Sequence, residues 1–172
     1  PLNLRRQRQM CIRDRIRSEH AAVTDPASGR IYIQGGRHGV LIQDSLNLTQ
    51  PNEQFYWLWS SDDGINWIPE NDTAEFEQGY LSRAEHKLVL MDETLFGFPG
   101  RKTSNVHFGF ASEEQYTFWR RDPGNLWSVD SEGSDFGARY GYGLVSHDGK
   151  VWVLGGDTGS NGPDNDVWYG EL

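Results

Sequence analysis

The sequence contains few of the residue types on which several common kinds of site depend. Its 172 residues include one cysteine, Cys11, and two methionines. Residues 12–172 contain no cysteine, which excludes disulfides, zinc–thiolate sites and cysteine nucleophiles from that part of the chain. No run of about 18 apolar residues occurs, so we expect no transmembrane helix and no membrane insertion. The N-terminal residues also lack the apolar segment typical of a signal peptide.

Glycine and aromatic residues are abundant. The chain has 20 glycines, and aromatic residues make up 13% of it, including seven tryptophans. Glycine supplies the positive φ angles of tight turns, and aromatic side chains fit a pleated, half-buried surface. This composition favours short strands joined by tight turns.

Residues 1–15 differ from the rest of the chain. They read PLNLRRQRQMCIRDR and show neither helical nor strand periodicity. Met10–Asp14 resembles the translation of a transposon end used in sequencing-library preparation, which implies an artefactual or disordered segment outside the domain. The alternative is a basic tail that binds nucleic acid or an anionic surface.

The remaining residues are strongly acidic. Five of the sixteen Lys and Arg residues and one of the twenty-five Asp and Glu residues lie in 1–15. Residues 16–172 therefore carry eleven basic and twenty-four acidic residues, a net charge of −13. Such a surface repels phosphate backbones, so we expect no nucleic-acid partner.

A short motif recurs along the chain. Arg17–His20 is repeated as Arg83–His86, 66 residues later, and more loosely as Arg139–Tyr142, 56 residues further on. Self-similarity at such a period is typical of repeat architectures, in which each repeat is one supersecondary unit. The chain is therefore organised by internal repeats.

Two short strands are predicted after each copy of the motif. Each pair is joined by a turn, and an Asp-Gly turn between two β-prone runs is a strong hairpin signal. A pair of small residues follows the second strand. The predicted strands are 20–23 and 31–33, 88–90 and 94–96, and 142–145 and 151–154; the turns are 25–29, 91–93 and 147–150; and the small pairs are Gly35-Gly36, Pro99-Gly100 and Gly155-Gly156.

A third, aromatic strand follows in each repeat, and a fourth in two of them. Three residues of the first repeat recur in the second at the same offset of 60 residues. The pairs are Trp59 and Trp119, Gly64 and Gly124, and Trp67 and Trp127, and the third repeat contributes Trp168 to its third strand.

These residues resemble the kelch family of β-propellers, of which the central domain of galactose oxidase is one. The resemblance rests on the opening Arg-x-x-His, the Gly-Gly pair and the two tryptophans, and it is weakest in the second copy, where Pro99 replaces the first glycine. It implies an all-β fold, a partial β-propeller of four-stranded antiparallel blades. We expect two full blades, at about 16–72 and 79–130, and three strands of a third at about 138–172. Since propellers need four to eight blades, we expect a truncated piece whose partners include the remaining blades.

The first repeat also resembles the Asp-box of sialidases and other propellers, Ser-x-Asp-x-Gly-x-x-Trp. Here it spans Ser60–Trp67, with Asp62 and Gly64 in the turn. The second copy, Arg120–Trp127, keeps Asp122 and Gly124 but has lost the serine. In such a turn the aspartate accepts hydrogen bonds from backbone N–H groups. We interpret both copies as structural turns rather than catalytic sites.

The three repeated arginines, Arg17, Arg83 and Arg139, have two readings. If they converged on one carboxylate, they would resemble the sialidase arginine triad. Because they hold equivalent positions in successive repeats, we expect one structural salt bridge or backbone contact per blade, with Glu19 and Glu85 as candidate partners. His20 and His86 are interpreted as strand-start residues and not as metal ligands.

No catalytic residue, metal site or cofactor is assigned. The loop at 157–166 is rich in Asp, Asn and Gly and invites a calcium reading, but Trp168 stands where an EF-hand needs Glu, and long turns use the same residues. Galactose oxidase relies on copper and a Tyr–Cys crosslink, which this cysteine-free part of the chain does not support.

We therefore expect a noncatalytic propeller module that binds a protein or carbohydrate partner through the loops at 37–54, 101–114 and 157–166. The alternative, which the family resemblance implies, is part of a propeller enzyme that acts on sialic acid or other glycans, as a sialidase or a mutarotase. The same resemblance points to an extracytoplasmic setting.

Overall fold

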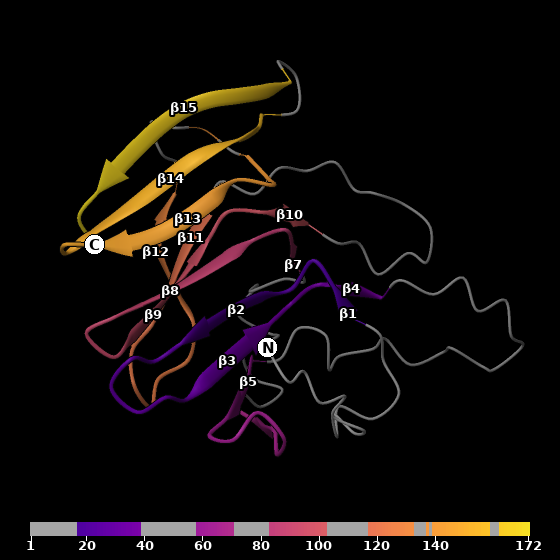
Figure 1. The fold of residues 1–172 in the computed structure, drawn as a ribbon, viewed down its shortest axis with the longest axis vertical. Coiled ribbons are helices and arrows are strands. Elements are labelled where there is room, and N and C mark those ends of the chain that lie inside the picture. The colour runs from indigo at the N-terminus through magenta and orange to yellow at the C-terminus, as the bar shows by residue number, and fades with distance from the viewer. Residues whose placement is uncertain are drawn as a thin grey trace, which may run out of the picture.

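The computed structural model describes residues 17–38, 58–70, 83–102, 117–132, 137, 139–158 and 162–172. Within these residues the regular elements are all strands, arranged in three larger antiparallel sheets and two short two-stranded ribbons (Figure 1). No helix in this part of the chain is long and apolar enough to span a bilayer.

The first sheet has four strands in the order β2-β3-β5-β6. The strands lie side by side in the order in which they occur in the chain, as in a β-meander. Strands β1 and β4, which flank β2 and β3 in the sequence, pair with each other in a separate two-stranded ribbon. The bounds are β1 Arg17–Ser18, β2 Ala21–Thr24, β3 Ile31–Gln34, β4 Arg37–His38, β5 Leu58–Ser61 and β6 Ile68–Pro69.

The second sheet repeats this plan as β8-β9-β11-β12, and β7 pairs with β10 in a matching ribbon. The third sheet has three strands in the order β13-β14-β15. The bounds are β7 Arg83–Ala84, β8 Lys87–Met91, β9 Thr94–Phe98, β10 Arg101–Lys102, β11 Thr117–Arg121, β12 Ser128–Glu132, β13 Gly143–His147, β14 Lys150–Asp157 and β15 Pro163–Gly170. The predicted fold class is confirmed: two four-stranded blades are followed by three strands of a third.

Tight turns join the inner strands of the second and third sheets. Asp92 and Glu93 have φ angles of 47° and 66°, and Asp148 and Gly149 have φ angles of 52° and 68°. Two successive positive φ angles define the type I′ turn, whose twist matches that of the flanking strands. Both hairpins therefore have two-residue loops, one residue shorter than the predicted turn at 91–93 and two shorter than that at 147–150.

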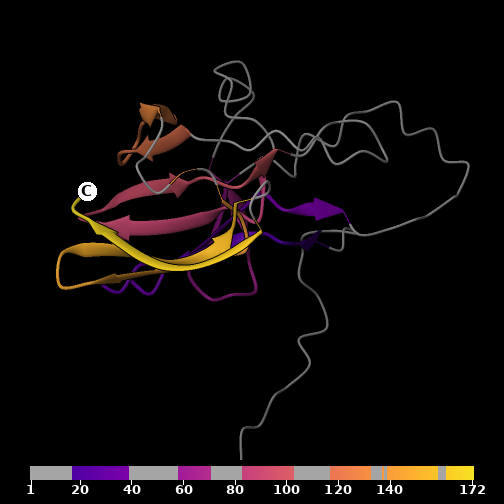
Figure 2. The same cartoon turned by 90° about the horizontal axis from the view of Figure 1, so that it is seen from above.

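The second sheet buries apolar side chains on both faces. Side chains alternate between the faces of a strand. On one face Leu88 and Leu95 pack with residues of the first sheet, and on the other Val89 and Phe96 pack with residues of the third. The innermost strands β2, β8 and β13 follow one another in space, with β8 in contact with both neighbours (Figures 1 and 2). The core is thus two layers, each between neighbouring blades.

The third residue of each repeated motif adopts a left-handed backbone. The φ angles are 57° at Glu19, 58° at Glu85 and 66° at Gly141. The amide of Glu85 donates to the carbonyl of Glu19 at 2.9 Å, which joins the first two repeats directly. The sequence showed the repeat, but only Gly141 signalled the positive φ, because Glu rarely adopts it.

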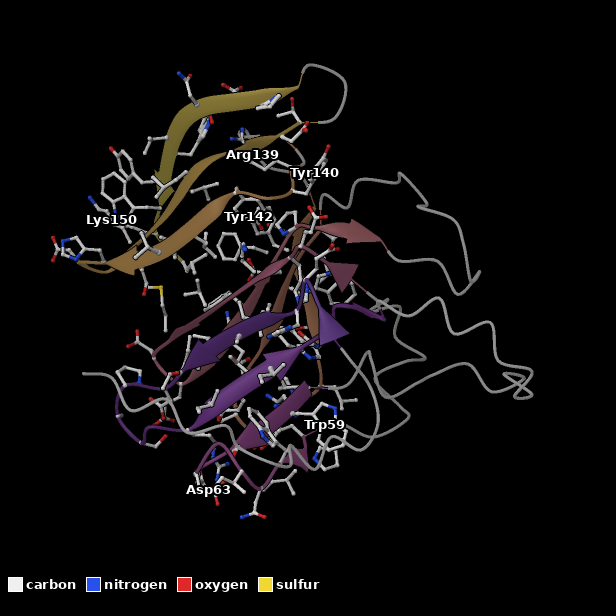
Figure 3. All side chains as sticks on the ribbon, turned by 45° about the vertical axis from the view of Figure 1, so that its right-hand side comes forward. Trp59, Asp63, Arg139, Tyr140, Tyr142 and Lys150 are labelled. Carbon is white, nitrogen blue, oxygen red and sulfur yellow. The ribbon has the colours of Figure 1, made fainter. Side chains whose placement is uncertain are left out.

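The third sheet is joined to the second through Tyr142 (Figure 3). This residue is 2% exposed, and its hydroxyl donates to the carbonyl of Pro99 at 2.5 Å. Gly156 lies directly beside it: with φ at 109°, an added Cβ would meet the Tyr142 Cβ at 2.8 Å. The second glycine of the pair therefore leaves room for the chain of the same blade at Tyr140 and Tyr142.

We predict that Tyr142→Phe destabilises the protein by about 1–3 kcal/mol, because it leaves the buried Pro99 carbonyl without its donor. Urea unfolding measures this. The same change at exposed Tyr169 is the control, and it should cost less than about 0.5 kcal/mol. Equal effects at the two positions would show that the bond to Pro99 does not hold the sheets together.

Candidate functional site

A groove lies between the first and second sheets, on the side of the hairpin turns. It has a volume of about 360 Å³. Turns and strand ends of both sheets contribute to it. The lining residues are Asp25, Ser28, Arg30, Tyr32, Glu70, Leu90, Glu93, Leu95, Arg121, Asp122, Pro123 and Gly124.

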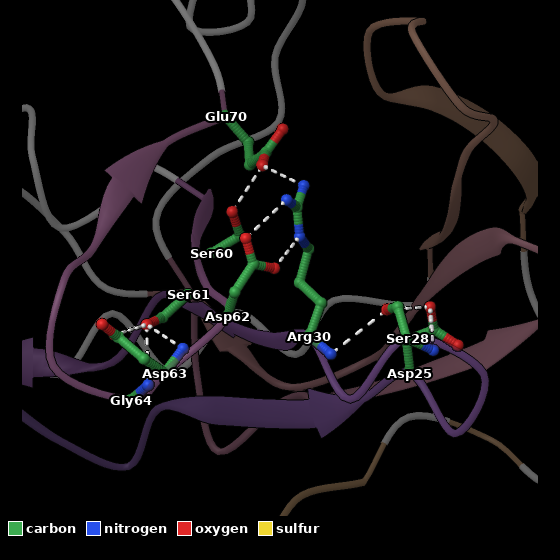
Figure 4. Close-up of polar contacts among 9 residues, drawn as sticks. All are labelled: Asp25, Ser28, Arg30, Ser60, Ser61, Asp62, Asp63, Gly64 and Glu70. Carbon is green, nitrogen blue, oxygen red and sulfur yellow. Dashed lines mark hydrogen bonds and ion pairs between the residues drawn. The ribbon is translucent and has the colours of Figure 1, made fainter.

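A polar network forms the first-sheet wall (Figure 4). The Arg30 guanidinium donates to both oxygens of Asp62, at 2.7 and 3.0 Å, and lies 3.7 Å from Glu70. The Ser60 hydroxyl donates to the same Glu70 carboxylate at 2.5 Å. Hydrogen bonding to Arg30 lowers the pKa of Asp62, and the same bonds raise the pKa of Arg30. Two outer strands are thereby tied to the β2–β3 turn.

The second-sheet wall is linked to the first through an arginine. Arg121 donates from its Nη2 to the backbone carbonyl of Glu70 at 2.9 Å. Beside it, Asp122 accepts from Arg120 at 2.9 Å and from the Thr94 hydroxyl at 3.0 Å. The bonds from Arg120, and then that from Thr94, lower the pKa of Asp122. The groove therefore has fixed walls, because its charged groups already hold one another.

The chemistry of these groups suits binding better than proton transfer. A general acid that works near neutral pH needs a carboxyl with a raised pKa. Among the carboxyl groups that line the groove, Asp25 and Asp122 have displaced pKa values, and hydrogen bonds lower both. These carboxylates are ionised acceptors set beside the apolar surface of Tyr32, Leu90 and Leu95.

The turn of the Asp-box-like motif is held by Asp63. Its Oδ1 accepts from the amides of Ile65 and Asn66, both at 2.7 Å. These hydrogen bonds lower the pKa of Asp63 to about 2, and the bond from the Asn66 amide has the largest effect. Ser61 also caps the turn, since its hydroxyl accepts from the Gly64 amide at 2.9 Å.

The assignment of this role to Asp62 was therefore wrong. Asp62 accepts from Arg30, at the end of the β2–β3 turn, whereas its neighbour Asp63 caps the β5–β6 turn. The second copy differs again: the turn bond runs from the Asn125 amide to the Asp122 backbone carbonyl at 3.0 Å, and the Asp122 side chain is used elsewhere. The two turns share their glycine and tryptophan but not their carboxylate geometry.

The motif glycines and tryptophans occupy repeated places in the sheets. Positive φ angles occur at Gly64 and Gly124, in the two turns, and at both members of the pairs after the second strand. Those pairs are Gly35-Gly36 and Gly155-Gly156, whereas Gly100 is buried behind Pro99. Trp119 and Trp127 are buried in the layer between the first two sheets, Trp59 and Trp67 are half-buried, and Trp168 is exposed.

Arg139 is committed to its own blade. It is 3% exposed, and its guanidinium donates to both Asp166 oxygens, at 2.5 and 3.1 Å, and to the Gly155 carbonyl at 3.0 Å. The indole of Trp168 donates to the same carboxylate, and both bonds lower the Asp166 pKa. The partner is Asp166, a residue that the sequence placed only in a variable loop. The side chains of Arg17 and Arg83 lie outside the described residues.

The other candidates are less informative. His20 is exposed and His86 is buried. In the part of the chain that the structure describes, no three His, Cys, Asp or Glu side chains gather as metal ligands would. Beyond their first two residues, the loops at 37–54 and 101–114 lie outside that part, as do residues 159–161 of the third loop.

The comparisons with known proteins agree with this geometry. Residues 138–169 match the Kelch motif family model. The three sheets have the arrangement of partial propeller blades, and the third of them lies, up to Tyr169, within the Kelch motif match. The structure of YjhT, a kelch-type propeller, superposes with a TM-score of 0.63 at 14% sequence identity. The match covers 90% of this chain and 49% of that one, so the chain spans about half the length of YjhT. No curated protein matches the sequence significantly.

We predict that Asp63→Asn loosens the β5–β6 turn and removes part of the pH dependence of stability. The folded pKa of about 2 lies below the ordinary value of 3.8, so the carboxylate stabilises the fold fully above about pH 4 and loses this effect as the pH falls towards 2. Hydrogen exchange of the Ile65 and Asn66 amides should be faster in the variant at pH 6, and the difference should shrink towards pH 2.

Asp148→Asn, in an exposed turn of the third sheet, is the matched control. It should leave the exchange of Ile65 and Asn66 unchanged. An Asp63→Asn protein with the same exchange rates at pH 6 as the parent would contradict the capping role.

Proposed function

We propose that this kelch-type module is a noncatalytic binding domain for a protein or carbohydrate partner. The observation that carries the proposal is the groove between the first two blades, which carboxylates and guanidinium groups line together with Tyr32, Leu90 and Leu95. Binding sites commonly combine a concave apolar surface with a few fixed polar groups. The variable loops at 37–54, 101–114 and 157–166 are a separate candidate binding surface, proposed from the sequence.

Of the two partner classes, the groove favours carbohydrate. Four carboxylates, from Asp25, Glu70, Glu93 and Asp122, line it together with two guanidinium groups. Such planar groups can bond two neighbouring hydroxyls at once. Tyr32 adds an aromatic surface of the kind on which a sugar ring packs. A volume of about 360 Å³ falls at the small end of ligand sites and suits one or two sugar rings.

The sialic-acid-processing alternative draws no support from Arg139. A guanidinium that reads a substrate carboxylate must be free to bond it, whereas Arg139 is buried and holds Asp166 and Gly155. Its hydrogen bonds link β14 and β15 within one blade.

A glycan array followed by calorimetry tests the proposal. We expect one class of neutral or cationic glycan to bind, since the groove is acidic, and Glu93→Gln to weaken that binding about tenfold or more through the loss of a charged hydrogen-bond acceptor. Asp92→Asn is the matched control, because Asp92 lies in the same turn but does not line the groove. It should bind as the parent does.

Two results would contradict the proposal in different ways. Glycan binding that Glu93→Gln leaves unchanged would place the ligand outside the groove. Chemical conversion of the bound glycan, followed by NMR, would show an enzyme instead of a binding module. If no glycan binds, the carbohydrate preference is wrong, and a peptide-display selection tests the protein class in its place.

A further inference from the structure

The groove between the first two sheets carries more negative than positive charge. Four carboxylates and two guanidinium groups line it, so the negative groups exceed the positive ones by two. Asp62 and Arg120 lie outside the lining but bond to groove residues, and their opposite charges leave this excess unchanged. The charged lining residues are Asp25, Glu70, Glu93, Asp122, Arg30 and Arg121. The charge that complements this groove is positive.

Both guanidinium groups of the groove are already engaged. Arg30 donates to both oxygens of Asp62 (Figure 4), and Arg121 donates to the backbone carbonyl of Glu70. A guanidinium that binds the carboxylate of a ligand presents two parallel donors to it. Arg30 uses such a pair of donors for Asp62. The groove is therefore better suited to a cationic ligand than to an anionic sugar.

Glu93 is the groove carboxylate that is available to a ligand. It lies in the β8–β9 turn and is exposed, and no described residue forms a hydrogen bond or ion pair with its carboxylate. Asp122, in contrast, accepts from Arg120. Asp25 accepts from the hydroxyl of Ser28. Glu93 can therefore bond a ligand without breaking a bond within the protein.

The geometry favours an organic cation over a metal ion. Calcium takes six to eight oxygen ligands, and the residues that the structure describes include no three acidic or histidine side chains placed as metal ligands. An ammonium group brings three donors of its own and needs only one or two acceptors from the protein. Asp25 and Glu93 line the same groove from hairpin turns of neighbouring sheets, so a molecule in it has a carboxylate on either side.

Apolar side chains lie in the same lining. Tyr32 and Leu90 line the groove and also pack against the core layer between the first two sheets, which holds them in place. Leu95 belongs to that layer and lines the groove as well. A sugar ring has an apolar face that packs on an aromatic ring, and its hydroxyls donate to carboxylates. A sugar that carries an ammonium group would use both the apolar and the acidic residues of the lining.

We propose that the groove binds a cationic amino sugar, a hexosamine with a free, protonated amine, whose ammonium bonds Glu93 and whose ring packs on Tyr32. This inference rests on the proposed carbohydrate-binding function and narrows it to one charge class of sugar. Because a hydrogen bond between an ammonium and a carboxylate is stronger than one between neutral groups, binding depends on the proton of the ligand amine.

Calorimetry with two matched disaccharides tests the inference. One consists of two glucosamine units, and the other is the same disaccharide with both amines acetylated. At about pH 5.5 we expect the free-amine form to bind about tenfold more tightly or better, because acetylation removes the charge. At about pH 8.5 the amines have largely lost their protons, so this preference should disappear, while the affinity of the acetylated form stays the same.

Two variants of neighbouring residues in one turn locate the ammonium. Glu93→Gln should weaken the free-amine form about tenfold at pH 5.5 and the acetylated form much less, so that the preference is lost. Asp92→Asn removes the same charge from the same turn but outside the groove lining, and it should leave both affinities unchanged. It controls for a general attraction of cations to the acidic surface. Circular dichroism checks that both variants are folded.

The possible results separate this inference from the function on which it rests. Equal binding of the two disaccharides, weakened by Glu93→Gln, would overturn the cationic preference and leave the carbohydrate proposal standing. Binding of neither, with another glycan bound in the groove, would do the same. Absence of any glycan binding would overturn both.

Two further results would overturn the inference alone. A preference for the free amine that survives Glu93→Gln, or that Asp92→Asn removes, would place the ammonium outside the groove. A trilysine peptide that binds as tightly as the free-amine disaccharide, and as sensitively to Glu93→Gln, would show that the groove recognises the charge without the sugar ring.

Discussion

The second sheet packs apolar side chains on both of its faces, and the placement of the other two sheets depends on this. Leu88 and Leu95 meet the first sheet, whereas Val89 and Phe96 meet the third. The two-residue period of the strand separates the two sets, so a shift of one residue in the register would exchange them. The type I′ turn at Asp92 and Glu93 sets the register of this hairpin.

The groove and the blade-to-blade contacts both follow from that stacking. The polar ends of the strands cannot join the apolar layers, so they pair at the hairpin turns, where Arg121 of the second sheet reaches the Glu70 carbonyl of the first. At the other end, Tyr142 reaches Pro99 in the same manner between the second and third sheets. A charged groove that also has a few apolar lining residues remains between two such blades, and it is the basis of the proposed binding function.

Much of this fold could be predicted from the sequence, because each repeat carries its own turn signals and strand pattern. Asp148 and Gly149, for example, mark their hairpin directly. The finer geometry could not be predicted. A pattern does not tell which of the neighbours Asp62 and Asp63 caps a turn, since that depends on the local backbone path. The left-handed Glu85 also gives no signal, because its conformation is held by contacts between repeats. The groove could not be predicted from either repeat alone, because residues of two blades line it.

Residue-resolved hydrogen exchange tests most directly whether the second sheet is the centre on which the other two depend. The amides of β8 and β9 that pair within this sheet should be the slowest to exchange in the protein. Both faces of the sheet are covered there, so these hydrogen bonds should open only in global unfolding. The amides of β6 and β15, at the outer edges of the first and third sheets, should exchange faster. Protection in β8 and β9 that is no higher than in those edge strands would contradict the account.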